Sequence, residues 1–232
     1  MQEIFENIYN KSKEEYFNYL RKLLKNNDKK FIITVNPEII INSEKNNEIK
    51  EILINKNNSL VPDGISVVKK TKKYNIDIKE RITGVDISEF LLKEANKNKN
   101  SIYLFGAKKV VISKLIEKIK SNYPNINILG YSDGYVKNKD KVMKEIINKK
   151  PDICMIALGV PNQELLINKY IDKVDKGIYI GVGGTFDVLS GCKKRAPQIF
   201  IKLNLEWLYR IICEPKRIGR FIKNNIVFMF KK

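Results

Sequence analysis

The chain has 232 residues, enough for one large domain or one domain with an appendage, and 43% are apolar, as expected for a buried core. It contains no histidine, which excludes Ser-His-Asp catalysis and most zinc sites and leaves proton transfer to Asp, Glu, Lys or Tyr. The 44 Lys and Arg against 26 Asp and Glu give a net charge of +18, which indicates either a solvated basic surface or a partner such as nucleic acid, anionic lipid or a phosphorylated substrate.

The cysteines and the apolar runs indicate the redox compartment of the protein and the kind of membrane contact that it can make. Cys154, Cys192 and Cys213 show no paired spacing, which favours a reducing compartment without a disulfide framework. The first residues are acidic and lack a long apolar run, so we expect no signal peptide. No segment approaches ~20 consecutive apolar residues, so any membrane contact is expected to be peripheral.

Short β-rich runs alternate with amphipathic stretches along most of the chain. Taken in order, we expect a helix at Lys11–Asn26, a strand at Phe31–Val35, a helix at Pro37–Asn55, a strand at Ser59–Val61, helices at Ile65–Lys73 and Ile87–Lys97, a strand at Ile102–Phe105, a helix at Lys108–Asn122, a strand at Ile126–Leu129, a helix at Asp140–Lys149, a strand at Ile153–Leu158, a helix at Asn162–Val174 and a strand at Ile178–Val182. This alternation predicts an α/β fold with a mostly parallel sheet and helices on both faces. After Ala196 the pattern is helical only, which predicts a catalytic core over 1–195 and a basic helical appendage over 196–232.

The predicted strands end in small or polar residues. Ligands of open α/β sheets bind beyond the carboxyl ends of the strands. Gly and Pro after one strand usually mark a turn, but six such ends in one sheet favour a cleft. These ends read T34-V-N-P, V61-P-D-G64, L104-F-G106-A, G130-Y-S-D-G-Y135, A157-L-G-V-P-N-Q-E164 and G181-V-G-G-T-F-D187.

Asp63 is the candidate general base. A carboxylate between Pro62 and Gly64 would face the cleft and accept a proton from an attacking hydroxyl, although an Asp-Gly pair also serves as a plain turn. Thr34 and Asn36 lie at the end of an adjacent predicted strand. Asn36 either caps the helix that begins at Pro37 or hydrogen-bonds a sugar hydroxyl.

A glycine-rich turn is the candidate phosphate site. Gly181, Gly183 and Gly184 form G-x-G-G rather than G-x-G-x-x-G, so the turn is weak evidence for a dinucleotide site. Asp187 suits a base N–H or a ribose hydroxyl, or else a helix start. Gln163 lies at another predicted helix start, where free backbone N–H groups meet anions. There is no Asp-x-Asp pair, which favours a metal-free mechanism with Arg and backbone N–H groups on the phosphates.

The carboxyl-terminal segment is strongly basic. Residues 193–232 hold eleven Lys and Arg against two Glu. Arg210, Arg217 and Arg220 would share one face of a continuous helix, but Pro215 favours a second short helix that begins near Arg217. Interleaved aromatic residues indicate either packing on the core or an amphipathic surface at the level of lipid headgroups.

Seven strings, taken together and in order, resemble the WecG/TagA/CpsF family, glycosyltransferase family 26, from about Phe31 to Phe221. They are T34-V-N-P-E38, V61-P-D-G64, R81-I-T-G84, A157-L-G-V-P-N-Q-E164, G181-V-G-G-T-F-D187, Arg195-Ala-Pro197 and L205-E-W-L-Y-R-I-I-C-E-P-K-R217. The resemblance implies an inverting, metal-independent glycosyltransferase with a Rossmann-like core and no cofactor. Such enzymes move a sugar, often N-acetylmannosamine, from a UDP donor to an undecaprenyl-diphosphate-linked sugar, in teichoic acid or related envelope polysaccharide synthesis at the cytoplasmic face of the membrane.

The resemblance also implies roles for individual residues. Asp63 would be the base, with Thr34 and Asn36 beside it, and Gln163 a substrate contact. Asp187 and Tyr135 would lie near the uridine. Apart from the resemblance, the strand-end pattern and the glycine turn make Gly106, Gly183 and Gly184 candidate substrate-binding residues. The appendage arginines Arg210, Arg217 and Arg220 would reach the diphosphates once the appendage closes.

The expected partners are a UDP-sugar, a polyprenyl-diphosphate-linked sugar and, peripherally, an anionic membrane surface, with no nucleic acid. A homo-oligomer is left open, because a neighbouring copy could occupy the site of the appendage. One departure is that residues 1–12 do not show the family's usual opening strand pair.

Two other classes remain as alternatives. A Rossmann-type nucleotide-sugar oxidoreductase is disfavoured, because no G-x-G-x-x-G follows the first predicted strand. A basic membrane- or nucleic-acid-binding module without catalysis is supported by charge alone.

Overall fold

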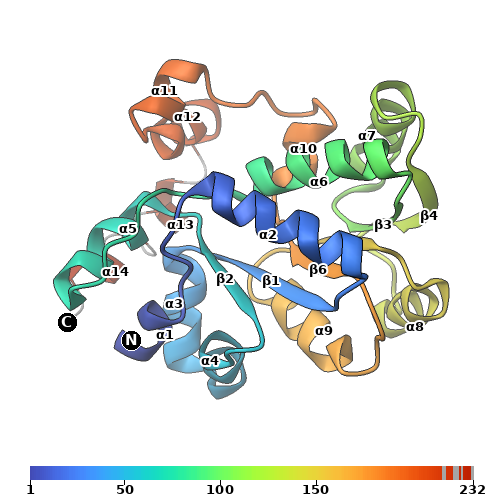
Figure 1. Cartoon of the computed structure of the whole chain (residues 1–232). Coiled ribbons are helices and arrows are strands. Elements are labelled where there is room, and N and C mark those ends of the chain that lie inside the picture. The colour runs from blue at the N-terminus through green and yellow to red at the C-terminus, as the bar shows by residue number, and fades with distance from the viewer. Residues whose placement is uncertain (216–217, 222–224, 226, 231–232) are drawn as a thin grey trace.

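Six parallel strands form one sheet between two layers of helices in the computed structural model, which describes residues 1–215, 218–221, 225 and 227–230 (Figure 1). The strand order is β2-β1-β6-β5-β3-β4, and every pair is parallel. The strands are β1 (Lys30–Val35), β2 (Ser59–Pro62), β3 (Ser101–Gly106), β4 (Asn127–Ser132), β5 (Ile153–Ala157) and β6 (Ile178–Gly181). The predicted α/β fold with a parallel sheet is therefore confirmed.

The apolar strands are buried because helices cover both faces of the sheet. One layer contains α2 (Lys13–Asn26), α6 (Gly84–Asn98), α7 (Lys109–Asn122) and α10 (Thr185–Leu189). The other contains α1 (Gln2–Glu6), α3 (Pro37–Lys45), α4 (Asn47–Ile54), α8 (Lys139–Lys149) and α9 (Asn162–Ile171). Along β1, Ile32 packs into the first layer and Phe31 and Ile33 into the second, as the alternation of side chains along a strand requires.

The single helix predicted over Pro37–Asn55 is wrong: two helices, α3 and α4, meet at Asn46. The backbone of Asn46 is extended, with φ −137° and ψ 109°. Its Oδ1 accepts hydrogen bonds from the backbone N–H groups of Glu48 (2.9 Å) and Ile49 (3.3 Å). An asparagine in an otherwise helical pattern is here an N-cap that starts a new helix.

The strand predicted over Ile126–Leu129 is displaced, because β4 runs from Asn127 to Ser132. Gly130, expected to begin a turn, pairs with Tyr103 of β3 beside a register shift. A Cβ at Gly130 would lie 2.6 Å from Cε2 of Tyr103. This glycine therefore marks the close approach of a neighbouring ring within the strand rather than a turn.

Several helix boundaries also differ from the predictions. α6 begins at Gly84 rather than Ile87, because Thr83 Oγ1 caps it by accepting from the N–H of Asp86 at 3.1 Å. α9 ends at Ile171, and α5 (Ile65–Thr71) gives way to the 3₁₀-helix η1 (Lys72–Tyr74). Residues 1–12 contain the short helix α1 and one parallel bridge from Ile8 to Leu60 of β2.

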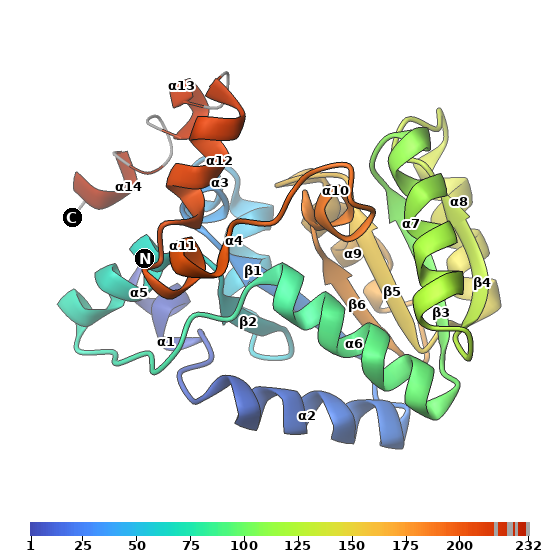
Figure 2. The same cartoon turned by 90° about the horizontal axis from the view of Figure 1, so that it is seen from above.

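The appendage is helical in its described part, as predicted. It contains α11 (Gln198–Lys202), α12 (Glu206–Cys213), α13 (Ile218–Phe221) and α14 (Val227–Phe230). Arg195 fixes the segment that leads into it, because its guanidinium pairs with Asp86 and Glu89 of α6. From there α11 and α12 cross to the side of the molecule that carries α3 and α5 (Figure 2).

The last described helix, α14, returns to the core. Phe228 is fully buried, and its ring meets that of Phe5 edge-on at 6.4 Å between centroids. The Lys70 ammonium lies 4.3 Å from the centre of the Phe228 ring and donates a hydrogen bond to the Phe228 carbonyl. The appendage is therefore tied to the core at both ends, by Arg195 and by Phe228.

We expect Phe228→Ala to release α14 from the core. Truncation of a buried phenylalanine costs about 3–5 kcal/mol when the site cannot collapse, and a terminal segment can detach instead. Limited proteolysis of the full-length protein should then cut the appendage faster than in the parent. The matched control is Phe230→Ala, since Phe230 is 85% exposed. Equal cleavage rates for the two variants would contradict the anchor.

Candidate active site

Asp63 is held where β2 and β1 end. Its backbone N–H donates to the carbonyl of Val35 at 3.0 Å, so the residue directly follows the last strand pair. The loop that precedes α6 reaches the same point, because the N–H of Ile82 donates to the carbonyl of Pro62 at 2.9 Å. These two bonds bring Arg81 next to the carboxyl end of β2.

The surroundings of Asp63 set its acidity. Loss of water around the half-buried carboxyl raises its pKa to about 6, with Arg210 and Arg81 opposing the rise and Glu206 and Asp86 adding to it. A carboxylate of this pKa is mostly ionised at neutral pH and is a better proton acceptor than an exposed aspartate. Asp63 therefore has the electrostatic setting of a general base.

A buried ion pair joins the appendage to this site. Arg81 and Glu206 are bonded through Nη2 and Oε2, with side-chain exposures of 13% and 7%. Glu206 is the first residue of α12, so the pair fixes the start of that helix, and Arg210 follows on the same helix. Of the three predicted arginines, Arg210 lies close enough to Asp63 for its charge to lower the pKa of that carboxyl.

The structure does not test the predicted roles of Arg217 and Arg220. Arg217 lies outside the described residues, and Arg220 belongs to α13 without a described side chain. Their predicted contacts with diphosphate stay predictions.

Thr34 and Asn36 lie at the end of β1, between Asp63 and the glycine turn. Thr34 is 5% exposed and its hydroxyl donates to the carbonyl of Gly181 at 3.4 Å. Asn36 Oδ1 accepts from the N–H of Ile39 at 3.1 Å, which confirms the helix-cap interpretation. A further bond from Asn36 to a sugar stays a prediction.

The glycine turn after β6 has the shape that its sequence indicates. Gly183 has a φ of +49°, which favours glycine, and Gly184 is the N-cap of α10. Asp187 lies in the first turn of α10, as expected of a helix-start carboxylate, with the Lys193 ammonium 3.8 Å away. A Cβ at Gly84 would lie 3.3 Å from Thr185 Oγ1, so the turn also packs against the start of α6.

Gly106 and Tyr135 lie at the same carboxyl-end edge of the sheet as Asp63, but near β3, on the opposite side of the strand order from β2. Gly106 has a φ of +126°, and a Cβ there would lie 2.4 Å from the carbonyl of Ala157. The N–H of Gly134 donates to the carbonyl of Ala107 at 2.8 Å, which holds the exposed Tyr135 beside the end of β3. Asp63 and Tyr135 are thus separated by about four strand spacings, or ~20 Å, so they can share only an extended ligand.

Gln163 is buried beneath the glycine turn rather than displayed in the cleft. It is 1% exposed. Its Oε1 accepts from the N–H of Gly159 at 3.1 Å and from the N–H of Gly183 at 3.0 Å. The predicted substrate contact by Gln163 is not tested, but its observed contacts connect the ends of β5 and β6.

Sequence reasoning missed Arg81 and Glu206. Arg81 belongs to the string R81-I-T-G84, but a lone arginine in a loop gave no indication of a role. Glu206 carried a signal that could have been used: it is one of two acids among eleven cations in residues 193–232. A buried partner is the usual reason to keep a carboxylate in such a segment.

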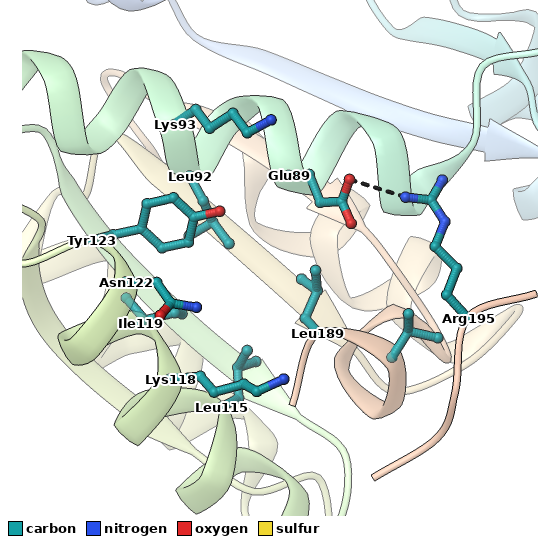
Figure 3. Close-up of a pocket in the computed structure, with 11 residues that line it drawn as sticks. Glu89, Leu92, Lys93, Leu115, Lys118, Ile119, Asn122, Tyr123, Leu189 and Arg195 are labelled. Atoms are coloured by element: carbon teal, nitrogen blue, oxygen red, sulfur yellow. Dashed lines mark hydrogen bonds and ion pairs between the residues drawn. The ribbon is translucent and has the colours of Figure 1, made fainter. Parts of the chain in front are cut away.

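A hollow of about 410 Å³ lies elsewhere, between α6, α7 and α10 (Figure 3). Leu92, Leu115 and Leu189 contribute to its wall, and the Arg195–Glu89 pair lies at one side. None of the predicted site residues whose side chains the structure describes lines it. The candidate site is therefore defined by the strand ends and not by this hollow.

Metal-ligating side chains do not gather within the described part of the chain. No group of three or more His, Cys, Asp or Glu residues there is close enough to hold an ion. The cationic groups near Asp63 are Arg81 and Arg210, which are suited to an anionic ligand.

Removing a positive neighbour and removing a negative neighbour should shift the pKa of Asp63 in opposite directions. Removing a cation disfavours the carboxylate, so we expect Arg210→Gln to raise the pKa of Asp63 above about 6, whereas Glu206→Gln should lower it. The pKa is measured by ¹³C NMR of labelled aspartate, with Asp63→Asn to assign the resonance. Shifts of the same sign in both variants would contradict the proposed placement of α12.

Comparison with known proteins identifies the family of the chain. The family model of the WecG/TagA/CpsF glycosyl transferases matches residues 4–232. An N-acetylglucosaminyldiphosphoundecaprenol N-acetyl-beta-D-mannosaminyltransferase of Bacillus subtilis (strain 168) is 47% identical over 191 residues, covering 82% of this chain and 74% of the relative. Proteins of the same name from Bacillus spizizenii (41% identical; 83% and 74% covered) and Staphylococcus aureus strain NCTC 8325 (37% identical; 87% and 78% covered) also match. The chain belongs to the WecG/TagA/CpsF family of glycosyl transferases.

Proposed function

We propose that this glycosyltransferase moves N-acetylmannosamine, with inversion and without a metal, from UDP to N-acetylglucosamine on undecaprenyl diphosphate, in teichoic acid or related envelope polysaccharide synthesis. The observation that carries the proposal is the Asp63 carboxyl, with a pKa raised to about 6 and Arg81 and Arg210 in its field, on the edge that also carries the glycine turn. The names of the relatives support this donor sugar and acceptor.

The reaction is a single in-line displacement. The Asp63 carboxylate accepts the proton of the acceptor hydroxyl as that oxygen forms a bond to the anomeric carbon. The bond from the anomeric carbon to the β-phosphate oxygen breaks, and its electron pair leaves with UDP. Arg210, together with Arg217 and Arg220, stabilises the charge that develops on the diphosphate.

The donor lies along the edge of the sheet. We assign the diphosphate to the turn of Gly183 and Gly184, whose backbone can approach phosphate closely. The uridine lies near Asp187 and Tyr135, beside Gly106. Gln163 supports the turn from beneath, and Thr34 and Asn36 lie between the turn and the base.

The appendage serves as the membrane-contacting part. Among the described residues, no helix has the length and apolar character needed to cross a bilayer. Ile199 and Leu203 are 63% and 62% exposed and lie one helical turn apart, within the segment that carries eleven Lys and Arg. Exposed apolar residues among cations fit peripheral contact with anionic lipid at the inner face of the membrane. Homo-oligomerisation, which the sequence leaves open, is tested by light scattering.

The proposed product is tested directly. The full-length enzyme is incubated with a panel of UDP-sugars and a short-chain polyprenyl-diphosphate N-acetylglucosamine, and the products are identified by mass spectrometry. Transfer from UDP-N-acetylmannosamine with release of UDP supports the proposal. Transfer of another sugar alone would assign a different donor.

Asp63→Asn should keep the fold and UDP binding and lose turnover by about 10²–10⁴-fold, the usual worth of general-base catalysis. The raised pKa predicts no loss of stability: the ionised folded form is disfavoured above about pH 6, and that penalty vanishes below the ordinary pKa. The variant should therefore melt at or above the temperature of the parent at pH 7.5. Turnover near that of the parent would refute the role of Asp63.

Replacing both Ile199 and Leu203 by Glu should reduce binding to vesicles that contain anionic lipid, because it removes apolar contact and adds negative charge. The control is Val110→Glu, since Val110 is also apolar and exposed (56%) but lies on α7. Co-flotation of the full-length variants with vesicles measures the effect. Unchanged flotation of the double variant would argue against contact through α11.

A further inference from the structure

The Gln163 side chain joins the loops that follow β5 and β6 through one amide group. Its Oε1 accepts from the N–H of Gly159 (3.1 Å), after β5, and from the N–H of Gly183 (3.0 Å), after β6. With both backbone groups pointing at the oxygen, the amide has one consistent orientation. Its Nε2 must then face an acceptor.

Glu164 supplies that acceptor. Gln163 Nε2 donates to Glu164 Oε1 at 2.8 Å. Glu164 is fully buried, and its other oxygen, Oε2, has no hydrogen-bond partner among the described residues. A buried carboxyl with an unsatisfied oxygen is costly, so its presence calls for a role that offsets the cost.

Gly181 shows how tightly the amide is held. A Cβ at Gly181 would lie 2.6 Å from Gln163 Nε2 and 3.0 Å from its Cδ. The first glycine of the turn is therefore required by the amide that packs against it. Gly183 is required by its own backbone, with a φ of +49°.

We propose that Glu164 is a positioning residue that orients the Gln163 amide, and through it holds the backbone of the Gly181–Gly184 turn in the shape that binds the donor diphosphate. The inference rests on the proposed UDP donor for its ligand but not for its geometry. Glu164 acts through Gln163 and touches no substrate itself.

The protonation state of Glu164 does not abolish this contact. Burial raises the pKa of Glu164 to about 7, so the charged and neutral forms coexist near neutral pH. In either form Oε1 can accept from Gln163. Glu164→Gln should therefore retain the acceptor, whereas Glu164→Ala removes it and frees the amide to rotate.

The first test uses the enzyme without ligand. Hydrogen–deuterium exchange of the full-length protein should show faster exchange at Gly159 and Gly183 in Glu164→Ala than in the parent, with Glu164→Gln close to the parent. The matched control is Glu94→Ala, which removes a carboxylate of α6 that is 9% exposed and paired with Arg21 of α2. Unchanged exchange at both glycines in Glu164→Ala would overturn the inference.

The second test measures the affinity of the enzyme for UDP. Loss of a hydrogen bond to a charged group lowers the population of the binding-competent turn, so Glu164→Ala and Gln163→Ala should each raise the Kd for UDP by about tenfold or more. The double variant should bind UDP only a little more weakly than either single variant, because both changes disrupt the same hydrogen-bonded arrangement of Gln163 and Glu164. Glu164→Gln should restore most of the affinity, and Glu94→Ala should leave it unchanged.

Gly181→Ala provides an independent check. In the parent its methyl group displaces the Gln163 amide and should weaken UDP binding, but in the Gln163→Ala background it should cause little further loss. A Glu164→Ala variant that is less stable yet binds UDP normally would reduce Glu164 to a structural residue. If the parent itself fails to bind UDP while the exchange result holds, the donor assignment fails and the positioning role stands.

Discussion

The ion pair between Arg81 and Glu206 is the contact that determines which residues of the appendage lie near Asp63. Both side chains are nearly buried, and a buried charge is stable only with its partner in place. Glu206 therefore has one favourable location, against the loop before α6, and that location places the start of α12. Because Arg210 follows on the same short helix, the pair also decides which cation lies near Asp63.

The acidity of Asp63 results from opposing effects around one carboxyl. Burial raises its pKa, two arginines lower it, and Glu206 and Asp86 raise it again. Two of these four neighbours, Arg210 and Glu206, belong to the appendage. The core thus supplies a carboxyl in a low-dielectric setting, and the appendage adjusts its proton affinity when it is docked. Arg210 and Glu206 of the docked appendage therefore contribute to the proton affinity of the proposed general base.

The sheet and the strand-end residues were predictable from sequence because both follow local rules. Apolar runs of strand length between amphipathic stretches indicate a covered parallel sheet, and parallel strands bring their carboxyl ends to one edge. Asp63, Thr34, Gly106 and the glycine turn were located by that rule. Resemblance to a family then supplied the chemistry, which periodicity alone could not.

What escaped prediction depends on contacts between distant segments. The role of Arg81 requires Glu206, 125 positions later, and nothing local marks the pair. Asn46 splits a helix because its side chain caps the next one, and Gly130 remains in a strand because Tyr103 fills the space beside it. Gln163 was expected to contact substrate because of its motif, whereas its burial beneath Gly183 appears only in three dimensions.

The return of Phe228 to the core gives the segment after Arg195 the topology of a closed loop rather than that of a free arm. When one attachment of such a loop breaks, the other keeps the released part near its docking surface. Rebinding is then intramolecular, at an effective concentration in the millimolar range for a short tether. For the appendage closure that the family resemblance implies, loosening one attachment at a time carries a far smaller entropic cost than recapture of a freely diffusing segment.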